Sequence, residues 1–192
     1  MKGINIFLED GFEDIEALAV SDALRRAGLK VSLVSCTSRR KVVSSHGVEV
    51  SADCLFSEIE KDSVPVDEKD VMIFPGGMPG SKSLSEFVPL IKAMREHFAN
   101  GGTLAAICAA PGLVLSQLDT LSGYTVTCFD GFQQPLIDKG AQFVKRPSVR
   151  SGRIITGRSA GYAVNFALEI LGAVADAKTL EKVYAGMLLE IE

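Results

Sequence analysis

Short apolar runs alternate with longer segments of helical period along almost the whole chain, and this alternation restricts the fold more than any other feature. Runs rich in Ile, Val and Phe that lack polar alternation suit strands of a parallel sheet covered on both faces. The pattern therefore predicts an α/β fold, namely a three-layer α/β/α sandwich with a mostly parallel central sheet. The predicted strands are Ile4–Leu8, Val31–Ser35, Val71–Phe74, Leu104–Ile107 and Ile154–Thr156, with shorter ones at Val48–Val50, Val126–Thr127 and Gln142–Val144.

Three amphipathic helices are predicted in the remaining sequence. One carries its apolar residues between Phe87 and Phe98 and ends at Asn100-Gly101-Gly102, because glycine favours the left-handed conformation that stops a helix. A second begins near Ala163 and is predicted to end at Gly172, and a closing helix runs from Leu180 to Ile191. The chain has 192 residues and no linker composition, so we expect residues 1–192 to form a single domain.

Composition and charge exclude several classes of function. The formal net charge is −4 and no basic run is longer than Arg39-Arg40-Lys41, so we expect no nucleic-acid partner. No apolar stretch approaches the roughly 20 residues that span a bilayer, and the first apolar run is too short for a signal peptide. We therefore expect a cytoplasmic protein with no membrane partner. Cys36, Cys54, Cys108 and Cys128 occur singly, so neither a disulfide framework nor a metal site is predicted.

Cys108 follows a predicted buried strand and precedes the small residues Ala109-Ala110-Pro111-Gly112. This order is typical of a nucleophile elbow, in which a sharp strand-to-helix turn holds the nucleophile above the sheet edge. The N–H groups and positive end of the next helix are expected to lower the thiol pKa. A buried structural cysteine is the simpler alternative, but the carboxyl edge of a parallel sheet is where such folds bind ligands.

Glu16 heads an apolar stripe formed by Val20, Ala23, Leu24 and Ala27 at helical spacing. A carboxyl that is buried in this way would have a raised pKa and could donate a hydrogen bond when protonated. An ordinary acidic residue at a helix N-terminus remains the alternative. Ile15 and Leu18 point away from the same stripe, which indicates a second apolar contact such as a partner subunit.

A glycine-rich turn, Pro75-Gly76-Gly77, follows another apolar strand. A phosphate cradle would place its glycines after the first strand, so we expect this turn instead to approach the Cys108 pocket and aim an N–H at an oxyanion. The two histidines precede Cys108. His46 is predicted in a hairpin turn and His97 on a helix surface, so a triad with its base after the nucleophile is disfavoured.

Three segments in this order resemble the ThiJ/PfpI superfamily, which has a class I glutamine amidotransferase-like fold. They are Asp10-Gly11-Phe12-Glu13-Asp14-Ile15-Glu16, Pro75-Gly76-Gly77 and Ala105-Ala106-Ile107-Cys108-Ala109-Ala110-Pro111-Gly112, and the match extends to Thr156-Gly157-Arg158-Ser159-Ala160-Gly161. Within the superfamily the sequence is most similar to the branch of the Parkinson-linked protein deglycase and its bacterial relatives.

The resemblance implies a flavodoxin-like sandwich, a homodimer and a redox-sensitive nucleophile, Cys108, with Glu16 as its protonated partner. It also implies that the backbone N–H groups of Gly77 and Ala109 are the oxyanion donors. Gly76, Cys128, Phe129 and Arg158 are expected around the pocket. Protease-like members have a histidine after the nucleophile, where this chain has Ala109, and many deglycase relatives have a histidine where this chain reads Cys128-Phe129. Peptidase activity is therefore not expected, and Cys128 is expected to lie near Cys108.

Two hypotheses about function use the same residues. In the first, the protein is an enzyme without a cofactor that acts on small reactive carbonyls such as methylglyoxal, or on the glycated protein adducts they form. In the second, it is a redox-sensing stress-response protein or chaperone whose Cys108 is oxidised to a sulfinate. Flavin or nucleotide binding on a flavodoxin-like scaffold is a third hypothesis.

Overall fold

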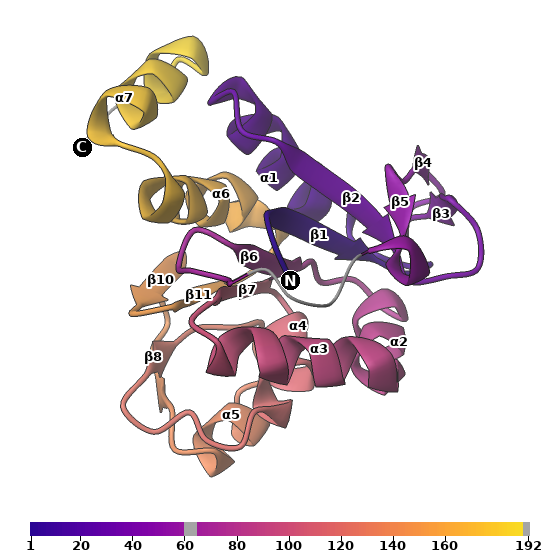
Figure 1. Ribbon diagram of the computed structural model, residues 1–192. Helices are drawn as coiled ribbons and strands as arrows, with labels where there is room; N and C mark the ends of the chain where they lie inside the picture. Colours follow the sequence, from indigo (N-terminus) through magenta and orange to yellow (C-terminus); the bar gives the residue numbers. More distant parts are fainter. Residues whose placement is uncertain (60–64, 190–192) are drawn as a thin grey trace.

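The computed structural model describes residues 1–59 and 65–189, which form a seven-stranded sheet between two layers of helices (Figure 1). All neighbouring strands are parallel except the β10–β11 pair at one edge. The predicted mixed α/β sandwich with a mostly parallel sheet is confirmed. In spatial order the strands are β10 (Ser148–Ser151), β11 (Ile154–Gly157), β7 (Thr103–Ile107), β6 (Val71–Phe74), β1 (Ile4–Leu8), β2 (Val31–Ser35) and β5 (Cys54–Leu55).

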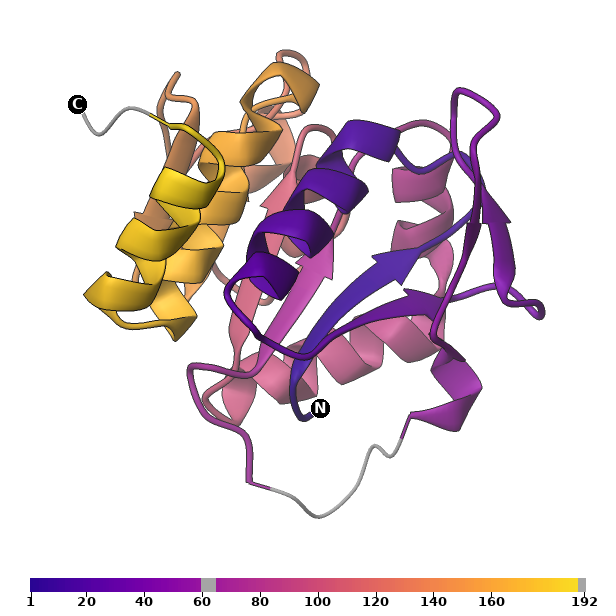
Figure 2. The same cartoon turned by 90° about the horizontal axis from the view of Figure 1, so that it is seen from above.

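The helices divide between the two faces of the sheet. Helices α1 and α6 lie side by side on one face, with α7 beside α6, whereas α3 covers the other face (Figure 2). The α-helices are α1 (Asp14–Arg26), α2 (Gly80–Glu86), α3 (Val88–Ala99), α4 (Ala110–Leu113), α5 (Gln134–Asp138), α6 (Ala163–Val174) and α7 (Ala177–Gly186). Short 3₁₀ turns are η1 (Phe56–Glu58), η2 (Leu115–Gln117) and η3 (Ala160–Tyr162).

Strand β1 shows how a continuous apolar run serves both layers. Ile6 and Leu8 pack into the cluster that contains α1 and α6, whereas Phe7 belongs to the cluster on the α3 side. Phe7 stacks there on Phe74, with ring centroids 5.5 Å apart. Successive side chains of a strand point to opposite faces, so a strand buried on both sides must be apolar at every position.

The shorter predicted strands form two small accessory sheets. β3 (Lys41–Val43) and β4 (Glu49–Ser51) make an antiparallel hairpin, while β8 (Thr125–Val126) and β9 (Gln142–Phe143) pair in parallel. The strands predicted at Val48–Val50 and Val126–Thr127 are each displaced by one residue, and the one predicted at Gln142–Val144 is one residue shorter. The sequence pattern missed β3, β5 and β10, which are short or polar and therefore carry little apolar signal.

Two predicted helix ends differ from the structure. Helix α6 continues through Gly172 to Val174, because Leu171 and Val174 remain buried and their packing outweighs the weak helix propensity of glycine. The closing helix α7 begins earlier, at Ala177, where the Asp176 side chain accepts a hydrogen bond from the N–H of Thr179 at 2.8 Å. It ends at Gly186, and the predicted end at Ile191 lies outside the described residues.

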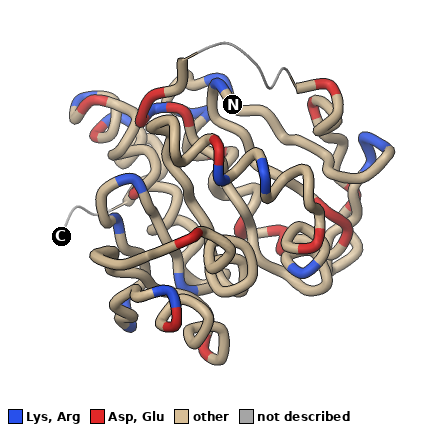
Figure 3. Tube along the Cα trace, turned by 60° about the horizontal axis from the view of Figure 1, so that its bottom comes forward, with Lys and Arg blue, Asp and Glu red and all other residues tan. Residues whose placement is uncertain are grey.

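Charged residues of both signs are distributed along the whole chain trace (Figure 3). Most ion pairs, such as Arg26 with Asp22 at 2.7 Å, join exposed groups and contribute little to stability. Among the helices of the described residues, none combines the length and the apolar character needed to cross a bilayer.

Candidate active site at the carboxyl edge of the sheet

Four neighbouring parallel strands, β11, β7, β6 and β1, bring the candidate residues together. Cys108 directly follows β7, Gly76 and Gly77 follow β6, and Glu16 lies in the first turn of α1 after β1. The carboxyl ends of parallel strands lie at one edge of the sheet, so segments far apart in sequence converge there. The structure thus brings together the three segments that the sequence singled out.

Cys108 has a left-handed backbone conformation, with φ of +65°, which is uncommon for any residue other than glycine. Two backbone hydrogen bonds hold it there. Its N–H donates to the Gly157 carbonyl at 3.0 Å, and its own carbonyl accepts from the N–H of Phe129 at 2.8 Å. The strained strand-to-helix turn predicted at Cys108 is therefore present, and its service as a nucleophile elbow stays a prediction.

Glu16 lies against Cys108 with Gly76 between them. The Gly76 N–H donates to Glu16 Oε2 at 2.7 Å, and the carboxyl also hydrogen-bonds with the Cys108 thiol. A Cβ on Gly76 would lie 2.5 Å from Cys108 Cβ and would also overlap Glu16 Oε2. Glycine is therefore required at position 76 for the acid and the thiol to meet.

The Glu16 side chain is completely buried, and this burial raises its pKa to about 7. The Gly76 N–H and the Cys108 thiol oppose the shift, while the charge of Glu13 adds to it. Within the described residues, Glu16 Oε1 has no hydrogen-bond partner, so it is the oxygen left to carry a transferable proton. The expected rise in the pKa of this carboxyl is confirmed.

The thiol pKa differs from the sequence prediction. Burial and then the negative charge of Glu16 raise the pKa of Cys108 to about 12, whereas the N–H groups of Ala109 and Gly77 lower it. The expected net lowering of this pKa was wrong, because burial and the Glu16 charge outweigh the N–H groups at the start of the short α4 (Ala110–Leu113). Since the Glu16 contribution requires an ionised carboxyl, thiolate formation is favoured when Glu16 holds the proton.

The two backbone donors named from the sequence both face the sulfur. The N–H groups of Gly77 and Ala109 hydrogen-bond with Cys108 Sγ. Gly77 has a φ of +90°, and a Cβ there would overlap the backbone of the 11–13 loop. Only glycine can take this conformation at such close approach. The turn after β6 is therefore shaped to aim its N–H groups into the site.

Of the other predicted pocket residues, Phe129 and Arg158 line a small cavity beside the Cys108 loop, together with Asp130 and Ser159. Asp130 was not predicted from the sequence, where its one signal is its position directly after Phe129. Cys128 is fully buried in the cluster on the α3 side, whereas Cys108 packs against the α1 and α6 cluster. Burial raises the pKa of Cys128 to about 12, so it is placed as a core residue.

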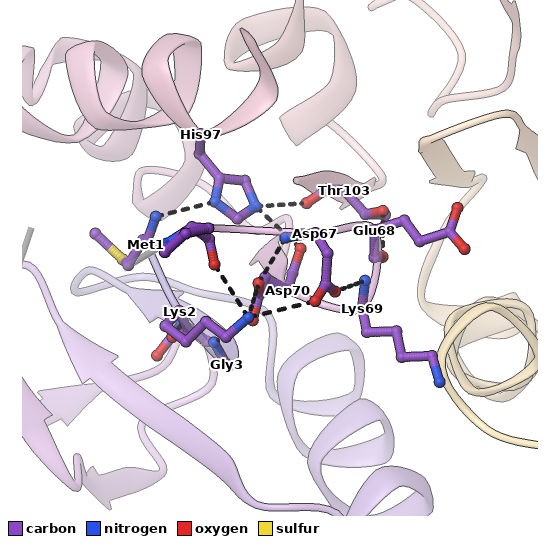
Figure 4. A network of polar contacts seen from close by, with 11 residues as sticks. Met1, Lys2, Gly3, Asp67, Glu68, Lys69, Asp70, His97 and Thr103 are labelled. Atoms are coloured by element: carbon purple, nitrogen blue, oxygen red, sulfur yellow. Dashed lines mark hydrogen bonds and ion pairs between the residues drawn. The ribbon is translucent and has the colours of Figure 1, made fainter. Parts of the chain in front are cut away.

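His97 is not on the helix surface where the sequence analysis predicted it. It is 2% exposed and lies at the opposite edge of the sheet, where Nε2 bonds with the Asp70 carbonyl at 3.0 Å (Figure 4). Its Nδ1 contacts the Met1 amino group at 3.2 Å. Burial lowers its pKa to about 4. The helical pattern could not show this, because the partners of His97 lie on other elements.

His46 lies in the β3–β4 turn, as predicted, and its Nδ1 is 2.6 Å from Asp14 Oδ2. This hydrogen bond, with the charge of Glu13, raises the pKa of His46. Glu13, Asp14 and His46 are also the one group of described side chains with potential ligand atoms within 4.8 Å of one another. Because the imidazole is itself the favoured cation between the two carboxylates, we assign these residues to an ion-pair cluster.

The sequence matches the DJ-1/PfpI family over residues 2–173. The chain belongs to the DJ-1/PfpI family. The resemblance to the ThiJ/PfpI superfamily inferred from the motifs is thereby confirmed, and the elbow, the glycine turn and the buried acid lie within the matched range.

Members of the DJ-1/PfpI family from several organisms are similar over most of the chain. Protein dj-1beta of Drosophila melanogaster is 30% identical and aligns with 98% of this chain and 97% of its own. The glutathione-independent glyoxalase DJR-1.2 of Caenorhabditis elegans is 29% identical, with 83% and 81% of the two chains covered. Oxidized DJ-1 of Toxoplasma gondii superposes with a TM-score of 0.88 at 28% identity, covering 100% of both chains.

Proposed function

We propose that this protein is a cofactor-independent enzyme that converts small reactive carbonyls, with methylglyoxal to lactate as the reference reaction. Free carbonyls would make it glyoxalase III-like, and glycated protein adducts would make it deglycase-like. One observation carries the proposal: a buried acid with a pKa of about 7 contacts a thiol whose sulfur also receives two backbone N–H groups. A nucleophile, a proton carrier and oxyanion donors are the groups this reaction needs.

The reaction uses the residues in sequence. The Cys108 thiolate adds to the aldehyde carbon of methylglyoxal, and the N–H groups of Gly77 and Ala109 bind the new oxyanion. Glu16 gives its proton to this oxyanion and so becomes a carboxylate. The carboxylate then removes the proton from the same carbon and returns it to the neighbouring carbon, while the hydroxyl proton passes to the neighbouring oxygen, which yields a lactoyl thioester. Water then hydrolyses the thioester, releasing lactate and the free thiol. No external oxidant or reductant is required, because the proton transfer reduces one carbon while oxidising the other.

Similarity supports this reaction class. A relative that is 29% identical over 83% of this chain is a glutathione-independent glyoxalase. A glyoxalase that needs no glutathione must supply its own nucleophile, and Cys108 is a free, partly exposed thiol that directly follows β7 at the carboxyl edge of the sheet. Because this similarity is spread over a long alignment, the activity of this chain needs an assay of its own.

The test follows methylglyoxal loss and lactate formation together. We expect the wild-type protein to release many lactate molecules per chain and Cys108→Ser to release none. Cys36→Ser is the matched control, because Cys36 is a buried core thiol outside the site and its loss should leave turnover unchanged. Turnover that persists in Cys108→Ser would overturn the proposal.

A redox-sensing or chaperone function is the second candidate, because the same N–H groups and acid would stabilise a Cys108 sulfinate. A similar structure, that of Toxoplasma gondii DJ-1, is of an oxidized form. The two candidates differ in stoichiometry. A sensor consumes oxidant in proportion to its thiol and releases no lactate, whereas an enzyme turns over.

All four cysteines are free thiols, which suits the cytoplasm as the proposed location.

A further inference from the structure

A cavity of about 80 Å³ lies beside the Cys108 loop and is lined by Phe129, Asp130, Arg158 and Ser159. Its walls come from the two segments that hold the Cys108 backbone. Phe129 itself donates to the Cys108 carbonyl, and Arg158 directly follows Gly157, which accepts from the Cys108 N–H. The cavity is therefore a neighbour of the nucleophile, although it is not the sulfur pocket formed by Gly76 and Glu16.

Arg158 supplies a partly satisfied charge to this cavity. Its side chain is 19% exposed, and Nη2 donates to Asp130 Oδ1 at 2.6 Å. Within the described residues Nη1 is buried and has no hydrogen-bond partner. A guanidinium presents its donors as a planar fork that matches both oxygens of a carboxylate. Asp130 accepts from Nη2, so Nη1 still has a hydrogen to donate to a further acceptor.

Asp130 is the more exposed member of the pair. Its side chain is 59% exposed and also lies 3.4 Å from Lys145 Nζ, so it can turn toward solvent and keep a cationic partner. The Arg158 backbone is fixed, because its N–H donates to the Pro147 carbonyl at 3.0 Å. A fixed cation with an exposed carboxylate on it is a site where an external carboxylate can replace the internal one.

Phe129 defines the rest of the ligand. Its side chain is 46% exposed and adds an apolar surface to the lining of the cavity. The cavity volume of about 80 Å³ suits a small ligand of a few heavy atoms. The ligand should therefore carry one carboxylate for Arg158 and a short apolar group for Phe129.

We propose that this cavity is a binding subsite for small hydroxy carboxylates such as lactate, held by Arg158 after displacement of Asp130. The choice of lactate rests on the proposed function, because that reaction would release a hydroxy acid next to the cavity. Recognition of the carboxylate stands on Arg158, Asp130 and Phe129 alone. The subsite would retain the product, so lactate would be an inhibitor as well as a product.

The test measures lactate binding by calorimetry on the intact protein, with lactamide as the neutral analogue. We expect lactate to bind wild type, lactamide to bind at least tenfold more weakly, and Arg158→Gln to weaken lactate binding at least tenfold. Asp130→Asn should tighten binding severalfold, because it removes the competing carboxylate. Lys92→Gln on α3 removes the same charge at an exposed position and should leave binding unchanged.

Weaker binding in Arg158→Gln could also come from misfolding of that variant. Tighter binding in Asp130→Asn could not, since unfolding does not increase affinity. Equal binding of lactate and lactamide, or weaker binding in Asp130→Asn, would overturn the subsite. Turnover of methylglyoxal is measured separately on the same preparations. Turnover without lactate binding would reject the subsite and leave the proposed enzyme standing, whereas binding without turnover would reject the enzyme and leave a carboxylate site.

Discussion

Glu16 and Cys108 meet across Gly76, whose N–H donates to Glu16 Oε2 at 2.7 Å while its missing side chain leaves room for the thiol. The pair shares its protons, because the carboxyl and the thiol each hydrogen-bond with the other and an ionised Glu16 opposes the thiolate. A negative charge on one partner therefore makes ionisation of the other less favourable, and the site holds one negative charge more readily than two.

Glu16→Gln should separate the two roles of the acid. The amide keeps a neutral donor of similar shape, so thiolate formation, followed by ultraviolet absorbance of the thiolate, should be preserved. Methylglyoxal turnover should fall by about 100- to 10,000-fold, because the transferable proton is gone. Glu16→Asp withdraws the carboxyl and should weaken both properties. Intact turnover in Glu16→Gln would show that the acid is only a supporting hydrogen bond, and loss of the thiolate would show that it acts when charged.

Thiol selectivity should depend on the protonation of Glu16. We expect the ratio of the Cys108 alkylation rate to the Cys54 alkylation rate to grow as the pH falls toward the Glu16 pKa of about 7. At that pH the carboxyl takes up a proton and no longer opposes the Cys108 thiolate, whereas the Cys54 thiolate only becomes scarcer. Mass-spectrometric mapping measures both rates. A ratio that does not change with pH, or one that keeps the same pH dependence in Glu16→Gln, would contradict the shared-proton account.

Gly76→Ala should abolish turnover, because the added methyl group would displace Glu16, Cys108 or the 75–77 turn. Gly161→Ala is the matched control, since a Cβ there has no atom within 4 Å and its backbone is not left-handed. The control should retain both turnover and the thermal midpoint of the wild type. Comparable loss in both variants, measured on the same preparations, would mean that the close approach at Gly76 is not what joins the pair.

The free energy of unfolding should respond to pH through Glu16 and His97 in opposite directions. The pKa of Glu16 is about 7 in the folded protein and 4.5 in the unfolded chain. Its contribution to the free energy of unfolding is therefore fully present below pH 4.5 and is lost as the pH rises through 7. The pKa of His97 is about 4 in the folded protein and 6.5 in the unfolded chain. Its contribution to the free energy of unfolding is therefore fully present above pH 6.5 and is lost as the pH falls through 4. Each corresponds to on the order of 3 kcal/mol.

Urea unfolding between these limits tests both contributions. Relative to the wild type, Glu16→Gln should gain stability as the pH rises, while His97→Gln should gain stability as the pH falls. The two variants have different surroundings, since Glu16 lies at the carboxyl edge of the sheet and His97 lies in the network around Asp70 (Figure 4). Parallel curves for wild type and either variant would refute the corresponding pKa.

The outer face of α1 should form a homodimer contact. Ile15 and Leu18 are 55% and 36% exposed there, as the helical pattern predicted, and Val48 next to the β3–β4 turn is 46% exposed. Light scattering should give about twice the chain mass of 20.5 kDa. Ile15→Asp should give one chain mass, whereas Val88→Asp on α3 should leave the assembly unchanged. A wild-type mass of one chain would reject the dimer.

The sequence by itself determined the layers and the turn that holds Cys108. β1, β2 and β6 have the predicted bounds because each is an uninterrupted apolar run, and such a run has few alternatives to a doubly covered strand. The Cys108 turn was also readable, since a strand followed by small residues needs no distant partner to be recognised. Glu16 was found because an acid at the head of an apolar stripe conflicts with its surroundings.

Only the tertiary structure decided the electrostatics. The pKa of Cys108 rises instead of falling, His97 is buried instead of exposed, and Arg158 is paired with Asp130. Each result depends on desolvation and on charges brought from other strands, and these add up over residues that are distant in the sequence. The local sequence determines which side chains a strand or helix carries. The packing of the elements determines the solvent exposure of those side chains and the charges that surround them.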